Sequence, residues 1–304
     1  MSDRPPPQLI AIFGPTGVGK TAIAVAVGDL LRERGEAPVA ISADALQVYR
    51  GLEMLTGAPS PEERARLDHR LVAFLDPSET FSVGEFMPMA HQEIDRALAD
   101  GRRPIVVGGT GLYLRAALTE LSLAPAPPPE LRARIEAELS ARGPAALHEE
   151  LRSRAPAAAA AIEPSDRTRI VRSLELLELG AEPPRTEDSE LWAGDVRVPT
   201  RLFGITMERE ALYEQIDARV DAMVEGGAAD EARHAALAGA SRTARAALGF
   251  EELLVGDVEG MKRNTRQYAR RQLTWMRKLR SIDVLDATGR DPAELAERII
   301  EVAG

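Results

Sequence analysis

Short apolar runs bounded by turn residues recur along the chain, and each predicts a buried β-strand. The runs cover residues 9–14 (LIAIFG), 38–44 (PVAISAD), 104–109 (PIVVGG), 201–206 (RLFGIT) and 282–287 (IDVLDA). Short segments that are apolar throughout are typical of parallel strands covered on both faces. The first and third runs are the clearest.

Apolar residues at helical spacing separate these strands. They predict a helix over 19–34 and another from Ser82 toward Asp100, where Ser82 and Glu85 have the spacing of a capping box. Strands that alternate with helices form a parallel sheet. We therefore expect an α/β fold in which helices flank a parallel sheet.

The alternation stops after residue 122. A proline-rich stretch over 124–130 predicts a stiff linker, and the amphipathic segments after it predict helices without a strand. A loop over 180–199 ends this part of the chain. We expect a small all-helical insertion domain over 123–199, with residues 1–122 and 200–304 forming the core.

The amino-acid composition excludes several classes of protein. Of 304 residues, 44% are hydrophobic, so the chain can bury a full core. There is no cysteine, which excludes disulfides, thiol nucleophiles and cysteine-bound zinc, and the four histidines lack the spacing of metal ligands. No apolar run approaches the roughly 18 residues of a membrane span, and no signal-peptide pattern is present. We expect a soluble, cytoplasmic protein without membrane contact.

Residues 14–21 (GPTGVGKT) match the phosphate-binding pattern G-x-x-x-x-G-K-[ST], between a predicted strand and a predicted helix. Backbone N–H groups and the helix N-terminus bind anionic oxygens in this pattern. Lys20 adds a positive charge, and the hydroxyl of Thr21 suits Mg²⁺. The core is therefore expected to be P-loop NTPase-like. The predicted phosphate-binding residues are Gly14, Pro15, Thr16, Gly17, Val18, Gly19, Lys20 and Thr21.

A nucleotide hydrolase also needs a carboxylate for its metal at the end of a second apolar strand. Asp76 stands at such a place, but Pro77 and a loop follow it, and the run 104–109 ends in Gly-Gly-Thr without an acid. The sequence therefore favours a use of the bound phosphate other than hydrolysis.

Polar residues also follow two of the other strands. Asp44 ends the run 38–44, and Gln47 lies one turn further on. Because the carboxyl ends of parallel strands line one crevice, Asp44 is expected near the phosphate site. There it would hold a metal or accept a proton, unless it only caps the next helix. Thr110 would present its hydroxyl at a helix start, or act only as a cap.

The predicted helix over 258–281 is strongly basic. Its residues 261–280 carry eight basic residues and no acid, although the chain has a net charge of −10. A single-sign stripe suits a phosphodiester backbone, whereas solvated faces usually mix both signs. The stripe consists of Arg263, Arg266, Arg270 and Arg277, and Trp275 on the opposite side is expected in the core. A second basic group in the insertion consists of Arg167, Arg169 and Arg172.

Taken together, these segments resemble the tRNA dimethylallyltransferase family, also called tRNA isopentenyltransferase, in its bacterial form. The matching segments, in family order, are GPTGVGKT, SADALQVYRG, FSVGEF, VVGGTGLYLRAAL, PSDRTRIVRSLEL, LYEQIDARVDAM, ALGFEEL and NTRQYARRQLTWMR. They span nearly the whole chain. The resemblance implies transfer of a dimethylallyl group from dimethylallyl diphosphate to N6 of an adenosine adjacent to the tRNA anticodon, with Mg²⁺ and release of diphosphate.

The resemblance also implies roles for individual residues. Asp44 would be the general base for the amine, and Thr110 would hydrogen-bond the bridging oxygen. The departing diphosphate would be neutralised by Lys20, by Thr21 with Mg²⁺, and by Arg219. The residues implied at the tRNA are Asp44, Ala45, Leu46, Gln47, Thr168, Arg169, Arg172, Gly249, Phe250, Arg263, Arg266, Arg270, Arg271 and Arg277. We expect a monomer whose insertion domain contacts the tRNA.

Three other functions stay open. A P-loop small-molecule kinase would share the core, an adenylate isopentenyltransferase would modify a free nucleotide without needing the basic helix, and an RNA-binding module would carry a degenerate phosphate site. The chain also departs from the family pattern at three places. The loop 55–59 (LTGAP) lacks the usual lysine, Arg70 replaces a histidine, and Phe250 replaces a tyrosine.

Overall fold

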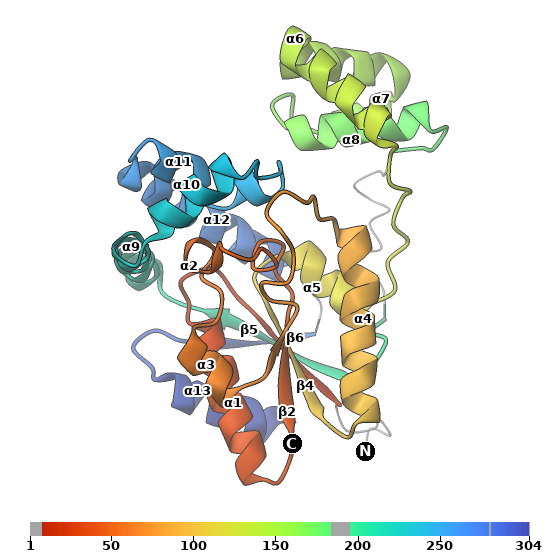
Figure 1. The fold of residues 1–304 in the computed structure, drawn as a ribbon. Coiled ribbons are helices and arrows are strands. Elements are labelled where there is room, and N and C mark those ends of the chain that lie inside the picture. The colour runs from red at the N-terminus through yellow and green to blue at the C-terminus, as the bar shows by residue number, and fades with distance from the viewer. Residues whose placement is uncertain (1–7, 184–194, 280, 304) are drawn as a thin grey trace. The chain divides into compact units, whose positions relative to one another are not determined.

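The computed structural model describes residues 8–183, 195–279 and 281–303. The chain divides into two compact units, one made of residues 1–120 and 195–304 and the other of residues 121–194. In the described residues, the first unit holds a β-sheet with its helices, and the second unit holds helices alone (Figure 1).

Six parallel strands form the sheet, in the order β3-β2-β4-β1-β5-β6. They are β1 (Leu9–Phe13), β2 (Pro38–Ser42), β3 (His69–Arg70), β4 (Arg103–Gly108), β5 (Thr200–Thr206) and β6 (Ile282–Asp286). Every residue of β1 and β2 is buried, as their uninterrupted apolar sequences require. The predicted fold class is confirmed. The strand β3 was not predicted, because two residues carry no periodic pattern.

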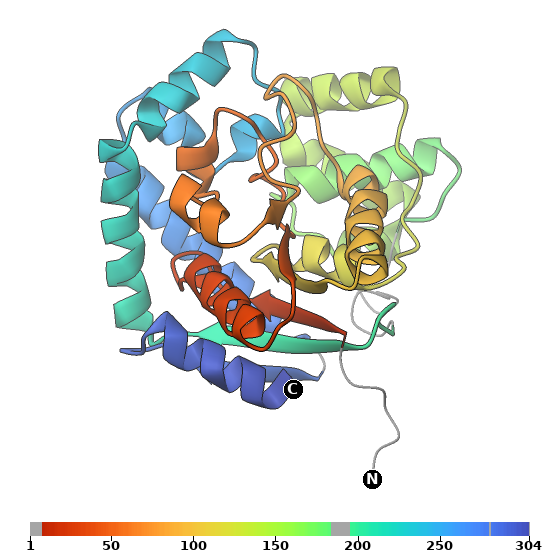
Figure 2. The ribbon, with the colours of Figure 1, turned by 60° about the horizontal axis from the view of Figure 1, so that its bottom comes forward.

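Helices cover both faces of this sheet (Figures 1 and 2). On one face α1 (Lys20–Glu33) packs along α13 (Pro292–Ala303), and on the other α4 (Val83–Ala99) packs along α5 (Gly111–Leu118). The predicted capping box is present at the start of α4, where the Ser82 hydroxyl accepts from the Glu85 amide and the Glu85 carboxylate accepts from the Ser82 amide. The helix prediction over 19–34 matches α1 closely.

Most of the remaining helices of the first unit lie near the carboxyl ends of the strands, and one short helix, residues 61–66, packs along α1 instead (Figure 1). The remaining helices are α2 (Glu53–Thr56), α3 (Pro61–Arg66), α9 (Arg209–Glu225), α10 (Ala228–Leu237), α11 (Phe250–Leu254) and α12 (Val258–Met276), with a 3₁₀ turn at Ala244–Ala246. The two long helices α9 and α12 pack against each other. Of the two, α12 corresponds to the helix predicted over 258–281.

The second unit has a hydrophobic core of its own. It contains α6 (Pro129–Arg154), α7 (Pro156–Ala160) and α8 (Arg167–Glu178), with Leu147, Leu151 and Ile170 completely buried among them. The backbone of Gly143 leaves the helical conformation with φ 78° and ψ 165°. This position divides α6 into the two shorter helices that the sequence indicates on either side of Gly143.

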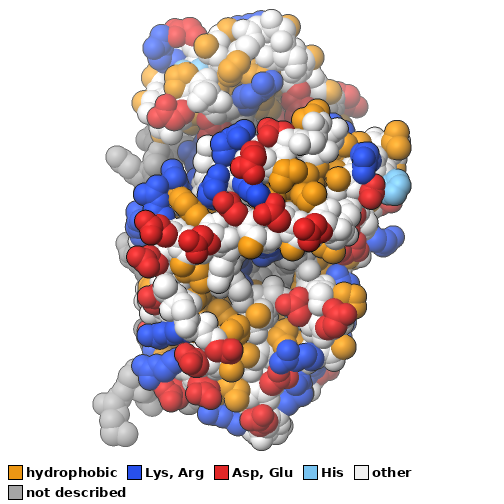
Figure 3. Space-filling model, turned by 90° about the vertical axis from the view of Figure 1, so that its left-hand side faces the viewer, with side chains coloured by type: hydrophobic (Ala, Val, Ile, Leu, Met, Phe, Trp, Pro, Cys, Tyr) orange, Lys and Arg blue, Asp and Glu red, His pale blue; other side chains and the backbone are white. Residues whose placement is uncertain are grey.

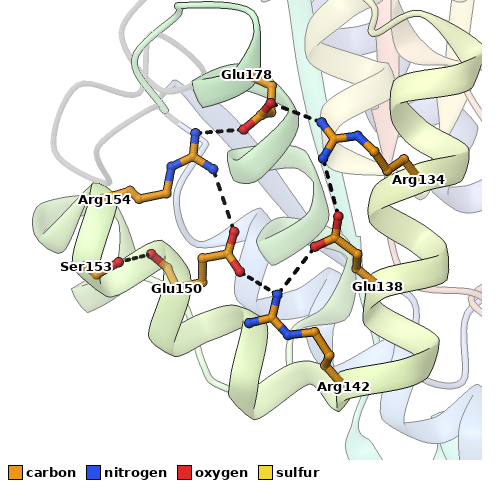
Figure 4. Close-up of polar contacts among 7 residues, drawn as sticks. All are labelled: Arg134, Glu138, Arg142, Glu150, Ser153, Arg154 and Glu178. Carbon is orange, nitrogen blue, oxygen red and sulfur yellow. Dashed lines mark hydrogen bonds and ion pairs between the residues drawn. The ribbon is translucent and has the colours of Figure 1, made fainter.

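A closed ring of ion pairs joins the two halves of α6 to α8 (Figure 4). Arg134 contacts Glu138 and Glu178, and Arg154 contacts Glu150 and Glu178. Arg142 completes the ring between Glu138 and Glu150. Each member has two partners, which makes the ring a network rather than a set of isolated surface pairs.

Residues 195–199 pack with the first unit, although the sequence placed them in the insertion. The Arg197 amide donates to the Leu118 carbonyl at 2.8 Å, and the Gln8 amide donates to the Pro199 carbonyl at 2.8 Å. These bonds align the segment with the start of β5.

Within the part of the chain that the structure describes, no helix has both the length and the apolar character needed to cross a membrane.

Candidate active site

The β1–α1 turn, residues 14–21, forms a phosphate cradle at the carboxyl edge of the sheet. Gly17 and Gly19 have φ values of 86° and 85°, a left-handed conformation that glycine adopts without strain. Gly14 is needed for a different reason, since a Cβ there would lie 2.9 Å from the Ile205 carbonyl oxygen. The backbone is therefore shaped as the motif requires.

A cavity of about 840 Å³ opens above this cradle. Thr16, Gly19, Lys20 and Thr21 line it, whereas Gly14, Pro15 and Val18 are buried beneath. Residues after β2, from α9 and from α12 complete the wall. They include Asp44, Leu46, Gln47, Gly57, Arg219, Met223, Tyr268 and Gln272. The structure thus brings three candidates for catalysis, Asp44, Lys20 and Arg219, to one cavity.

Asp44 faces the cations of the cavity. Its Oδ1 accepts a hydrogen bond from the Leu46 amide at 2.9 Å, which fixes the carboxylate at the end of β2. The Asp44 charge acts on both Lys20 and Arg219, where it favours the protonated forms. Asp44 caps no helix here, because the residues after it form turns until α2 begins at Glu53.

Lys20 carries a strongly shifted pKa. Burial and the nearby Arg219 lower the pKa of Lys20 to about 7, although Asp44 works in the opposite direction. Its ammonium donates to the Pro15 carbonyl at 2.8 Å. Burial also lowers the pKa of Arg219. The cavity therefore concentrates positive charge that a bound anion would stabilise.

Inorganic diphosphate is expected to bind with proton uptake through Lys20. Near pH 8 the free Lys20 is mostly neutral, and a bound anion favours its ammonium form, so binding raises its pKa and takes up a proton. Near pH 6 Lys20 is already charged and this uptake disappears. Isothermal titration without added metal, in buffers of different ionisation enthalpy, measures the uptake. Lys20→Met corrects for protons on diphosphate itself, and equal uptake by both proteins contradicts the prediction.

Thr110 precedes α5, but its hydroxyl does not cap that helix. Its Oγ1 lies 3.2 Å from the hydroxyl of Tyr268 on α12. Burial, with Asp44 as a smaller cause, raises the pKa of Tyr268 to about 12, so Tyr268 keeps its proton. Thr110 is therefore oriented by a neighbour that lines the cavity, and the simple capping alternative is not what the structure shows.

The loop after α2 rests on Gln47 and Arg219. Gln47 Nε2 and an Arg219 guanidinium nitrogen both point at the Gly57 carbonyl, at 3.0 and 3.4 Å. A Cβ on Gly57 would lie 1.7 Å from the Arg219 guanidinium. On α10, the Glu231 carboxylate accepts from the amides of Met54 and Leu55 and holds the start of α2. Sequence reasoning missed Glu231, which stands in an ordinary charged helix pattern.

The basic stripe of α12 is less uniform than its sequence indicates. Arg266 forms an ion pair of 2.7 Å with Asp217, and Lys262 pairs with Asp221. Both acids belong to α9. Arg263 lies 3.5 Å from Asp257. On the side of the first unit where α9 lies, basic and acidic side chains are interspersed (Figure 3).

Other arginines of α12 lie against aromatic rings. Arg270 stacks on the Tyr213 ring and donates to its hydroxyl, and Arg271 lies 5.4 Å from the centre of the Tyr268 ring. Burial raises the pKa of Tyr213, but hydrogen bonds from Arg270 and Arg209 outweigh this effect, and the pKa is lowered overall. Arg277 caps the end of α12 and is exposed. These arginines keep their charge available to an anion. Trp275, expected in the core, is half-buried and packs on Gly111.

Several expected tRNA contacts lie elsewhere. Phe250 is completely buried, and Gly249 is buried beside Met261. The LGF segment contributes Leu248 to the cavity wall, and a tRNA contact of the other two residues stays a prediction. In the second unit, Arg172 donates to the carbonyls of Ala124 and Pro125 and ties the linker to α8.

The start of α8 keeps two of the predicted residues accessible. Thr168 and Arg169 are exposed on its first turn, and the side chain of Arg169 is 63% exposed with only Asp166 nearby, at 3.5 Å. Ala45, Leu46 and Gln47 are half-buried, and the last two line the cavity. Among the described residues predicted to contact tRNA, some are therefore accessible, and others are buried or bonded within the protein.

The cavity suits a metal ion that is held mainly by the oxygens of a bound phosphate compound and by few protein groups. Among the described residues, no group of three or more histidine, aspartate or glutamate side chains is placed to hold a metal alone. Thr21 lines the cavity next to Lys20. Mg²⁺ commonly uses one or two protein groups together with phosphate oxygens and water. This donor set fits Mg²⁺.

Comparisons with known proteins agree with the geometry. The family model described as IPP transferase matches residues 47–279. A tRNA dimethylallyltransferase of Symbiobacterium thermophilum is 40% identical, over 92% of this chain and 90% of its own length. A solved tRNA isopentenylpyrophosphate transferase of Bacillus halodurans is 35% identical with a TM-score of 0.67, over 97% of this chain and 94% of that chain. A solved eukaryotic dimethylallyltransferase acting on tRNA is 26% identical with a TM-score of 0.72, and the match covers 92% of this chain and 74% of that chain. This chain belongs to the IPP transferase family.

Proposed function

We propose that this protein transfers a dimethylallyl group from dimethylallyl diphosphate to N6 of an adenosine adjacent to the tRNA anticodon. One observation carries the proposal: Lys20, Thr21 and Arg219 line the same cavity as the carboxylate of Asp44. The cations suit a departing diphosphate, and the carboxylate suits an amine. The name of the relatives, tRNA dimethylallyltransferase, supports transfer of a dimethylallyl group to tRNA.

In the proposed reaction, the N6 lone pair forms a bond to the first carbon of the dimethylallyl group. The bond from that carbon to oxygen breaks, and its electron pair leaves with the diphosphate. Asp44 accepts the proton that the amine loses. The Thr110 hydroxyl donates to the bridging oxygen, while Lys20 and Arg219 neutralise the charge that develops on it.

Thr21 would hold Mg²⁺ together with the diphosphate oxygens, and the bound ion supplies further positive charge to the leaving group. The adenine must leave its stack to reach Asp44 inside the cavity. Leu46 and Gln47 line the same cavity as Asp44 and would contact the extruded base. The described residues of one chain supply all these groups, so we propose a monomer, which sedimentation of the free protein tests.

Radiolabelled dimethylallyl diphosphate separates the candidate functions. The protein is incubated with the label, Mg²⁺ and either unmodified tRNA, AMP or ATP. Label in tRNA alone is expected. Label in AMP and none in tRNA overturns the proposal in favour of an adenylate isopentenyltransferase, and phosphate transfer from ATP without prenylation favours a kinase.

In the first unit, Arg270 and Arg271 on α12 and Arg277 at its end are proposed to contact tRNA. In the second unit, Thr168 and Arg169 on α8 are proposed to contact tRNA as well. Arg263 and Arg266 are already paired with acids and would contribute less. A cation near a phosphate releases counterions from the RNA, which makes binding dependent on salt.

Replacing both Arg270 and Arg271 by alanine is expected to weaken tRNA binding and to flatten its salt dependence. The slope of log Kd against log salt should fall by about 2, one for each lost phosphate contact. Filter binding between low and moderate salt measures the slope. Arg298→Ala on α13 serves as control, because Arg298 pairs with Glu301 on an exposed surface. An unchanged slope in the double variant would mean that these arginines only face solvent.

A further inference from the structure

Helix α12 reaches into the cavity through a buried glutamine. Gln272 is 4% exposed, and both ends of its amide are bonded. Oε1 accepts from the Thr16 amide at 2.7 Å, and Nε2 donates to the Gly109 carbonyl at 2.8 Å. Gln272 therefore joins two segments that are remote in sequence, the phosphate cradle after β1 and the turn after β4.

Close approach of α12 depends on two glycines in that turn. A Cβ on Gly109 would lie 2.3 Å from Gln272 Nε2 and 3.3 Å from Lys20 Nζ. A Cβ on Gly111 would lie 2.2 Å from the Trp275 ring. Without side chains at these two positions, the helix can pack directly on the turn that carries Thr110.

The bridge fixes the distance between two groups that the reaction needs. Thr16 belongs to the cradle for the diphosphate, and Gly109 directly precedes Thr110, whose hydroxyl also contacts Tyr268 on the same helix. Resting on the proposed function, we propose that Gln272 is a positioning residue: it holds the cradle and Thr110 in register so that the bridging oxygen of the bound diphosphate meets the Thr110 hydroxyl.

Gln272→Met removes both hydrogen bonds at nearly constant volume. The single-turnover rate with dimethylallyl diphosphate and tRNA is expected to fall by about 10²-fold, the usual effect of a misplaced reacting group. The Kd for tRNA should stay within about twofold, because the arginines of α12 face outward. Gln267→Met makes the same change on the exposed face of the same helix and should leave the rate within about twofold of wild type. A wild-type rate in Gln272→Met overturns the proposal, as does a parallel loss of rate and tRNA affinity.

Gln272→Glu tests the position of this side chain without relying on turnover. The carboxylate still accepts from the Thr16 amide, but it loses the donor to the Gly109 carbonyl and places a negative charge beside the cradle. The affinity for inorganic diphosphate, measured by isothermal titration without tRNA, is expected to fall by about tenfold or more. Unchanged diphosphate affinity overturns the inference. If wild-type protein fails to prenylate tRNA while this loss is observed, the proposed function fails and the link between Gln272 and the cradle stands.

Discussion

Asp44→Asn is expected to lower the rate of prenyl transfer by about 10²- to 10⁴-fold, the range that a general base contributes. Asparagine keeps the oxygen that accepts from the Leu46 amide, so the turn after β2 is preserved. It cannot accept a proton from the adenine amine. Single-turnover measurements with saturating tRNA and dimethylallyl diphosphate isolate this chemical step.

Binding and stability provide the controls for Asp44→Asn. The Kd for tRNA should stay close to that of wild type, because asparagine keeps the shape of the side chain. The melting temperature should fall, because asparagine no longer offsets the charges of the buried Lys20 and Arg219. A nearly normal transfer rate would remove Asp44 from its role as the base. A loss of tRNA binding that accounts for the whole effect would make it a binding residue instead.

Lys20→Met is expected to lower kcat/KM by about 10²- to 10³-fold, as for the loss of one group that stabilises developing charge. Methionine fills similar space but brings no charge to the diphosphate. Arg219 stays in the cavity and limits the loss. The rate measured across a series of dimethylallyl diphosphate concentrations gives both kcat and KM.

Lys262→Met is the matched control for Lys20→Met. Lys262 is ion-paired with Asp221 and Glu259 and does not line the cavity, so its removal should change kcat/KM by no more than about twofold. Equal effects of the two substitutions would show that general charge, rather than the ammonium in the cradle, supports the reaction.

Much of the first unit follows from local sequence patterns. The five longer strands are short apolar runs, and the cradle is a contiguous motif whose glycines have the backbone angles that the motif requires. The position of Asp44 follows from the rule that parallel strands end at one edge of the sheet. These features depend on neighbours in sequence or on regular sheet geometry, and both can be inferred without coordinates.

Contacts between helices that are far apart in the sequence could not be inferred in the same way. Residues 261–280, which include most of α12, carry eight basic residues and no acid. The acids that pair with Arg266 and Lys262, Asp217 and Asp221, stand on α9. Phe250 shows the same limit, since its complete burial depends on segments that pack around it. Gln272 offered a weak signal, a polar residue on the inner stripe between Ala269 and Met276.

The position of β1 between β4 and β5 has a consequence for synthesis of the chain. When the ribosome has made β1 to β4, one edge of β1 still lacks its hydrogen-bonding partner, because β5 begins only at Thr200. The helical unit over 121–194 is translated in this interval and has its own core. The helical unit can therefore complete its folding before β5 is synthesised and pairs with β1.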